Sequence, residues 1–186
     1  YFTYTEENPI SFNPFYTDDY VFDVEKKDSI KTLLLTLWKT EDDKITKTES
    51  GELGSAVSAY IERIRSDRSI IPSLNTFYEY MRDDYRREME EREIRVRRED
   101  FDIDNLLVTL RQYYRGGRYD FLLNSTENID LLSKRFIVFE IDSIKENREL
   151  FPVVTIIIME AFINKMRRLK GVRKQLIIEE AWKALS

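Results

Sequence analysis

The sequence predicts an α/β fold dominated by helices, in which a helical subdomain precedes a βαβ unit. Three observations support this prediction. Apolar residues recur at helical spacing through the middle of the chain. Two nearly continuous apolar runs flank one long helical segment near the C-terminal end. Charged residues make up 35% of the 186 residues, a proportion typical of long helices with solvated faces.

Residues 1–25 are predicted to be an extended strand and loop segment. Tyrosine, phenylalanine and threonine dominate its first half, and these residues favour strands. Asn8-Pro9 and Asn13-Pro14 are turn signals, because each proline disfavours the helical conformation of the residue before it. The pattern therefore predicts a strand, a turn and an ordered loop.

Residues 26–130 are predicted to form the helical subdomain. Apolar stripes predict helices over about 26–39 and 53–65, and Ser73 is a candidate cap for a third. The highly charged run from Arg82 to Asp100 is predicted to continue as a long exposed helix with i,i+4 ion pairs. A further helix is predicted over about 103–114, ending at two consecutive glycines.

Residues 131–186 are predicted to form a βαβ unit. The run RFIVFEID at 135–142 and the run QLIIEE at 175–180 are typical of strands buried on both faces. Between them, residues 146–170 are predicted to be a helix, with cations in its last turns and Gly171 just beyond. Such a unit places its two strands parallel, joined by a right-handed crossover.

Composition excludes several chemistries. The chain contains no cysteine and no histidine, which excludes disulfides, thiol nucleophiles and serine–histidine–aspartate catalysis. Any catalysis must use carboxylate, lysine, arginine, tyrosine or hydroxyl side chains, and Mg²⁺ is the natural metal for oxygen ligands. The net charge of -5 gives no general attraction to nucleic acid or to an anionic membrane.

The start of the chain, its apolar runs and its lack of cysteine lead to three further expectations. The chain begins YFTYTEENPI, without methionine or signal peptide, so we expect it to be the interior of a longer polypeptide. The most apolar run, VVTIIIM, is much shorter than the roughly 20 residues of a membrane span. The absence of cysteine suits the cytoplasm, and we expect any contact with the inner membrane to be made through partner subunits.

Two adjacent glutamates, Glu179 and Glu180, follow the second predicted strand. Parallel sheets bind ligands at the carboxyl ends of their strands, and adjacent strand residues point in different directions. One carboxylate can therefore hold a metal through water while the other orients a nucleophilic water, as nucleotide hydrolysis requires. The competing interpretation is that both acids only end a strand and begin the next helix.

Four segments resemble one family. LIIEEAWKAL is similar to the Walker B segment of conjugative-transfer ATPases, in which a hydrophobic strand leads to Asp-Glu-Ala-Trp. Asn13-Pro14-Phe15, the run GGRYDFLLN at 116–124 and the strand RFIVFEID also resemble segments of these enzymes, in the same order. The best match is the TraG-type ATPase of conjugative transposons, which is related to type IV secretion ATPases. The resemblance implies a helical subdomain inserted in part of a RecA-like parallel sheet.

By that resemblance Glu180 matches the catalytic glutamate and Glu179 the acid on the Mg²⁺ side of the nucleotide. The family usually has aspartate where Glu179 stands, and glutamate is one methylene longer. Glu140 and Asp142, at the end of the neighbouring predicted strand, are candidates to line the same nucleotide-binding crevice. The alternative for this second pair is a solvated strand end. The whole assignment depends on Ile177 and Ile178 lying in a buried strand with a parallel neighbour.

The sequence lacks the phosphate-binding loop GxxxxGK[ST], whose backbone N–H groups and lysine hold phosphates. In the family that loop lies upstream of the Asn-Pro-Phe segment, so we expect this chain to begin after it. The expectation is that the parent protein uses ATP and Mg²⁺, whereas this piece alone binds neither and is inactive. The resemblance also implies a hexameric homo-oligomer and contacts with other subunits of the conjugation or secretion machinery.

Two other functions compete with this interpretation. The first is a non-catalytic helical protein-interaction module, in which the charged run from Arg82 to Asp100 binds a partner. The second is nucleic-acid binding through residues 95–98 and through YYRGGR at 113–118, because arginines beside aromatic rings stack on bases and contact phosphates. The acidic net charge argues against the second.

Overall fold

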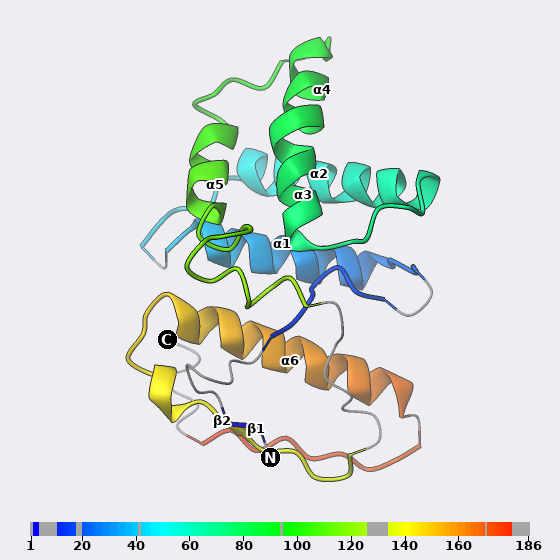
Figure 1. Cartoon of the computed structure of the whole chain (residues 1–186), viewed down its shortest axis with the longest axis vertical. Helices are drawn as coiled ribbons and strands as arrows, with labels where there is room; N and C mark the ends of the chain where they lie inside the picture. Colours follow the sequence, from blue (N-terminus) through cyan, green and yellow to red (C-terminus); the bar gives the residue numbers. More distant parts are fainter. Residues whose placement is uncertain are drawn as a thin grey trace. The chain divides into compact units, whose positions relative to one another are not determined.

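The protein is described from a computed structural model, and its structure is described for residues 2–3, 11–17, 20–40, 42–93, 95–125, 134–169 and 171–179. The chain divides into two compact units. We call Ser11–Asn128 the helical unit, and Tyr1–Ile10 together with Ile129–Ser186 the terminal unit. Helices dominate both units within the described ranges (Figure 1). This agrees with the predicted predominance of helices.

The helical unit begins with two capped helices, α1 (Val24–Trp38) and α2 (Lys47–Ser66). Asp23 caps α1, since its Oδ1 accepts a hydrogen bond of 2.7 Å from the backbone N–H of Lys26. The prediction placed the start of α2 at residue 53. The helix begins at Lys47 because Thr46 and Glu49 form a reciprocal capping box.

The third helical segment has three parts, which are α3 (Leu74–Tyr80), the π-helical turn η1 (Met81–Tyr85) and α4 (Arg86–Glu91). The predicted long helix through Asp100 is wrong. Arg92 leaves the helical conformation, with φ −66° and ψ 142°, and its guanidinium contacts Glu52 at 2.7 Å and the hydroxyl of Tyr85 at 2.9 Å. Because Arg92 makes these contacts instead of continuing the helix, α4 ends at Glu91.

An aromatic core holds the helical unit together. Phe15, Tyr60 and Phe77 are completely buried, and their ring centroids lie 5.2–5.4 Å apart in stacked and edge-to-face pairs. They come from the loop before α1, from α2 and from α3, which are distant in sequence. The core therefore joins segments that neither helical periodicity nor local turn signals relate to one another.

The last helix of this unit, α5 (Ile103–Leu110), ends four residues before the predicted position. Residues 111–118, which we call the arginine loop, turn back on themselves instead. The backbone N–H of Tyr119 donates to the carbonyl of Gln112 at 2.8 Å, and that of Gly117 to Tyr114 at 2.7 Å. These bonds close a compact turn.

Gly117 is required by that turn. A Cβ at this position would lie 2.6 Å from the backbone oxygen of Arg111 and still closer to that of Gln112. We expect Gly117→Ala to destabilise the helical unit by about 1–3 kcal/mol, since rigid backbone must move aside. The measurement is the free energy of unfolding in urea. The matched control is Gly51→Ala inside α2, where a Cβ meets nothing within 4 Å. There we expect stabilisation by about 0.5–1 kcal/mol, and equal effects of the two substitutions would contradict the argument.

The terminal unit contains one short parallel pair and one long helix. Strand β1 (Phe2–Thr3) pairs with β2 (Phe139–Glu140) in parallel, with Phe2 opposite Phe139 and Thr3 opposite Glu140. After the 3₁₀ turn η2 (Asp142–Ile144) comes α6 (Leu150–Arg168). Asn147 Oδ1 accepts hydrogen bonds of 3.0 Å from the backbone N–H groups of Glu149 and Leu150 where α6 begins.

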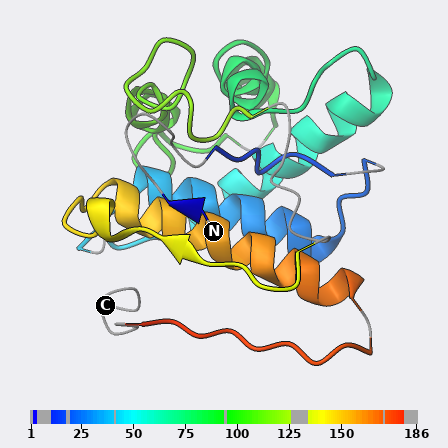
Figure 2. The same cartoon turned by 60° about the horizontal axis from the view of Figure 1, so that its bottom comes forward.

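The second strand of the predicted βαβ unit is not formed within the described residues. Residues 171–179 are extended without strand pairing, and Figure 2 shows them as a tube rather than an arrow. Ile177 is 74% exposed and Ile178 43% exposed. The predicted strand at 135–142 is likewise reduced to Phe139–Glu140. A RecA-like sheet is therefore absent from the described part of the chain.

The reason for this difference is physical. An apolar run specifies which side chains favour burial, but a strand exists only where a neighbour supplies its hydrogen bonds. Parallel pairs of two residues stabilise little by themselves and need further strands around them.

No helix in the described ranges is long and apolar enough to cross a membrane.

Candidate functional site

Two of the four acidic residues predicted to form the site, Glu140 and Asp142, lie where β2 ends. Glu140 ends β2 and is half-buried, while Asp142 begins η2 and is exposed. The backbone N–H of Asp142 donates to Glu140 Oε1 at 3.1 Å, and Lys145 Nζ contacts Asp142 Oδ1 at 3.3 Å. Glu140 thus ends a strand of a parallel pair, and Asp142 follows it two residues later. Oxygen ligands of this kind suit Mg²⁺.

Of the other two predicted site residues, the structure describes only Glu179. Glu179 lies exposed at the end of the extended segment 171–179. Glu180 lies outside the described residues. Across the described ranges no group of three or more acidic side chains is placed to hold a metal ion. The catalytic role of Glu180 and the metal-binding role of Glu179 therefore stay predictions.

The Asn-Pro-Phe segment has a structural role in the helical unit. Asn13 is buried, its Oδ1 accepts from the backbone N–H of Phe15 at 2.9 Å, and its Nδ2 donates to the carbonyl of Pro72 at 2.8 Å. The asparagine thereby forms a local turn and ties the loop before α1 to the loop before α3. Phe15 then enters the aromatic core. Within this chain these three residues organise packing.

A part-buried polar network that joins α2, η1 and the residue after α4 was not predicted from the sequence. The hydroxyl of Tyr85 donates to Glu52 at 3.1 Å and accepts from Arg92, and Arg92 contacts the carboxylate of Glu52. Burial is the largest cause that raises the pKa of Tyr85 to about 12, so its hydroxyl stays protonated at neutral pH. The only signal in the sequence was a tyrosine within a charged run, because its partner Glu52 lies 33 residues away.

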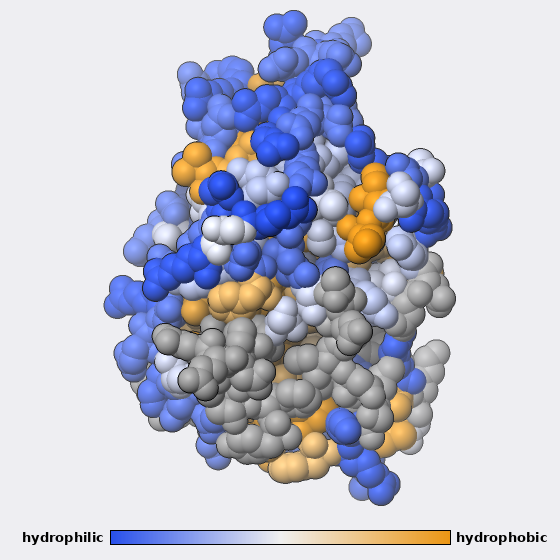
Figure 3. All heavy atoms as spheres, in the orientation of Figure 1, coloured by the Kyte–Doolittle hydropathy of each residue, from blue (hydrophilic) through white to orange (hydrophobic). Residues whose placement is uncertain are grey.

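The arginines of the charged run are largely neutralised. Arg97 contacts Asp100 at 2.7 Å and Arg98 contacts Asp102 at 3.3 Å. Hydrophilic side chains cover the visible face around α4 (Figure 3). This part of the predicted nucleic-acid surface therefore presents paired charges, as is typical of a surface that only contacts solvent.

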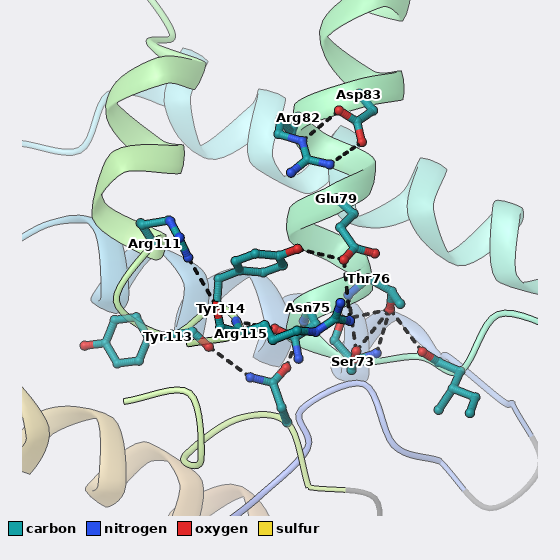
Figure 4. Close-up of polar contacts among 12 residues, drawn as sticks. Ser73, Asn75, Thr76, Glu79, Arg82, Asp83, Arg111, Tyr113, Tyr114 and Arg115 are labelled. Carbon is teal, nitrogen blue, oxygen red and sulfur yellow. Dashed lines mark hydrogen bonds and ion pairs between the residues drawn. The ribbon is translucent and has the colours of Figure 1, made fainter. Parts of the chain in front are cut away.

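The arginine loop is a second polar cluster, and Figure 4 shows its contacts. The ring of Tyr114 stacks on Tyr78 with a centroid distance of 4.4 Å and an interplanar angle of 23°. The hydroxyl of Tyr114 donates to Glu79 Oε1 at 2.8 Å, and this hydrogen bond is the largest cause that raises the pKa of Tyr114. The loop is thus fixed on one face of α3.

The chain matches one family of known proteins. The family model of the TraG P-loop domain matches residues 1–186. A search of curated proteins found no match. The family match spans both units and includes all four acidic positions discussed above.

Proposed function

Because this chain belongs to the TraG P-loop domain family, we propose that it is part of an ATPase that drives conjugative transfer through a type IV secretion-like system. The observation that carries the proposal is the family match over residues 1–186. P-loop proteins bind nucleotide together with Mg²⁺. The proposed cofactors of the complete enzyme are therefore ATP and Mg²⁺.

The proposed roles of the four acids follow from their chemistry. Glu180 orients the water that attacks the γ-phosphate, and Glu179 binds Mg²⁺ directly or through water. Glu140 and Asp142 line the nucleotide crevice. The position of this second pair at the carboxyl end of β2 supports its part in the proposal, because parallel sheets bind ligands at that end of their strands.

We propose that different segments of the chain belong to two parts of the enzyme. Residues 1–25 and 131–186 belong to the ATPase core, and residues 26–130 are its helical subdomain. We propose that residues 175–180 become a strand of a RecA-like parallel sheet in the complete enzyme. In the described structure Leu176, Ile177 and Ile178 are exposed and unpaired, contrary to the buried strand that the sequence predicted, so this part of the proposal rests on the family match alone.

The proposed setting of the enzyme is the cytoplasm, where it assembles as a homo-oligomer, a hexamer, with other subunits of the conjugation machinery. Contact with the inner membrane is proposed to occur through those subunits.

A hydrolysis assay tests the proposal. The 186-residue chain alone is expected to release no measurable phosphate from ATP, because it lacks GxxxxGK[ST]. The same chain extended by its upstream-encoded residues is expected to contain that loop and to hydrolyse ATP only with Mg²⁺. A gene without such a loop, or an extended protein without turnover, would favour the non-catalytic helical module. Robust Glu180-dependent hydrolysis by the 186-residue chain would contradict the proposal that this chain alone is inactive.

A further inference from the structure

The arginine loop contains three arginines whose ion pairing is weak or absent within the described residues. Arg111 and Arg118 are exposed, and neither makes an ion pair with a carboxylate in the described part of the chain. Arg115 is 69% exposed in its side chain and approaches a carboxylate only at 3.6 Å, that of Glu79. By contrast, most arginines between Arg63 and Arg98 contact a carboxylate at 3.3 Å or less.

Aromatic rings position these guanidinium groups. The guanidinium carbons of Arg111 and Arg115 lie 5.3 and 5.9 Å from the ring centroid of Tyr114, and that of Arg118 lies 5.0 Å from Tyr119. Cation–π contacts leave the N–H edges of a guanidinium available to donate. Among the described contacts, one N–H group of Arg111 donates to the carbonyl of Arg115 and one of Arg115 faces Glu79, so most N–H donors of these oriented groups remain available.

The backbone beneath the patch is rigid. The backbone N–H of Arg115 donates to Asn75 Oδ1 at 2.8 Å, and Asn124 Nδ2 donates to the carbonyl of Tyr113 at 2.9 Å (Figure 4). Asn124 Oδ1 in turn accepts from the backbone N–H of Asn75 at 2.8 Å. Because these bonds join the loop to α3, little order is lost when a ligand binds.

We propose that this patch, formed by Arg111, Tyr114, Arg115 and Arg118, binds single-stranded nucleic acid. The guanidinium edges donate to phosphate oxygens, and their planar faces stack on unpaired bases. Two acids belong to the patch, Glu79 and Asp120. The hydroxyl of Tyr114 and the backbone N–H of Gly116 orient these carboxylates, and the three arginines outnumber the two acids by one.

A nucleic acid fits this surface better than an acidic protein segment does. Stable protein interfaces bury an apolar centre. Of the three tyrosines that flank or lie within this loop, Tyr113 and Tyr119 are buried in the fold and only Tyr114 is partly exposed. Phosphate contacts require no apolar partner surface. The proposal does not rest on the ATPase function, because ATP and Mg²⁺ take no part in this binding.

The test is a fluorescence anisotropy titration of the 186-residue chain with a labelled twenty-nucleotide oligo-dT, at several salt concentrations and without ATP. We expect binding that weakens with salt. In the triple variant Arg111→Ala, Arg115→Ala, Arg118→Ala we expect affinity to fall by about tenfold or more. The slope of log K against log salt should become less negative by about 2, because each of the three lost phosphate contacts contributes roughly 0.7 to it.

A charge-matched control separates this patch from general electrostatics. Arg87→Ala, Arg97→Ala, Arg98→Ala removes the same charge from exposed side chains that contact acids. We expect it to leave the slope unchanged, and circular dichroism of both variants confirms folding. The proposal is overturned if the wild-type chain shows no salt-dependent binding or if both variants lose affinity equally. It is also overturned if polyglutamate of equal charge competes as well as unlabelled oligo-dT.

Discussion

Glu180→Gln is expected to lower the ATP turnover of the extended enzyme by about 100-fold or more, since the amide cannot accept a proton from the attacking water. The side chain keeps its size, so ATP binding should remain close to wild type. Turnover is measured by phosphate release, and affinity by titration with a fluorescent ATP analogue. A loss of kcat with little change in nucleotide affinity is the expected result.

The matched control for this substitution is Glu99→Gln, because the side chain of Glu99 is 85% exposed in the helical unit. It should leave kcat unchanged. Glu179→Gln provides a second comparison, in which the Mg²⁺ concentration needed for half-maximal turnover should rise, since one carboxylate ligand is lost. If Glu180→Gln retains more than half of the wild-type turnover, the assignment of the catalytic acid is wrong.

Phe77→Ala is expected to destabilise the helical unit by about 3–5 kcal/mol, the range for removing a buried phenylalanine ring. Phe77 is completely buried, and its ring contacts those of Phe15 and Tyr60 at 5.4 Å between centroids. The cavity would lie where α2, α3 and the Asn-Pro-Phe segment meet. The measurement is urea-induced unfolding followed by circular dichroism.

The control uses the same substitution at an exposed phenylalanine. Phe136 is 84% exposed, so Phe136→Ala should change the free energy of unfolding by less than about 0.5 kcal/mol. Similar losses at both positions would contradict the assignment of the aromatic core. Since the chain has two compact units, the transition of each variant is compared with that of the wild type over the full urea range.

The apolar stripes predicted most of the helices in the helical unit correctly. The predicted residues Ile30, Leu33 and Leu37 lie buried on one face of α1. The cap at Ser73 was also predicted, and its Oγ accepts from the backbone N–H of Thr76 at 3.2 Å. These features depend on residues within a few positions of each other, so periodicity and capping rules capture them.

The candidate site was less predictable. The sequence identified Glu140 and Asp142 as neighbours, and the structure joins them through one hydrogen bond. It did not predict that Glu179 lies on an exposed segment, because a strand requires a partner as well as an apolar run. The contacts of Arg92 with Glu52 and Tyr85, which end α4, were equally hidden, since they join residues far apart in the chain.

The sequence by itself determined the predominance of helices, the absence of thiol and imidazole chemistry, and the resemblance to conjugative-transfer ATPases that the family match supports. Tertiary structure alone decided which charges remain unpaired. Within the described residues, Arg111 and Arg118 of the arginine loop make no ion pair, whereas Arg97 and Arg98 do. The physical reason is that local patterns act through the spacing of neighbouring residues, whereas ion pairs and strand pairing depend on which distant segments come together.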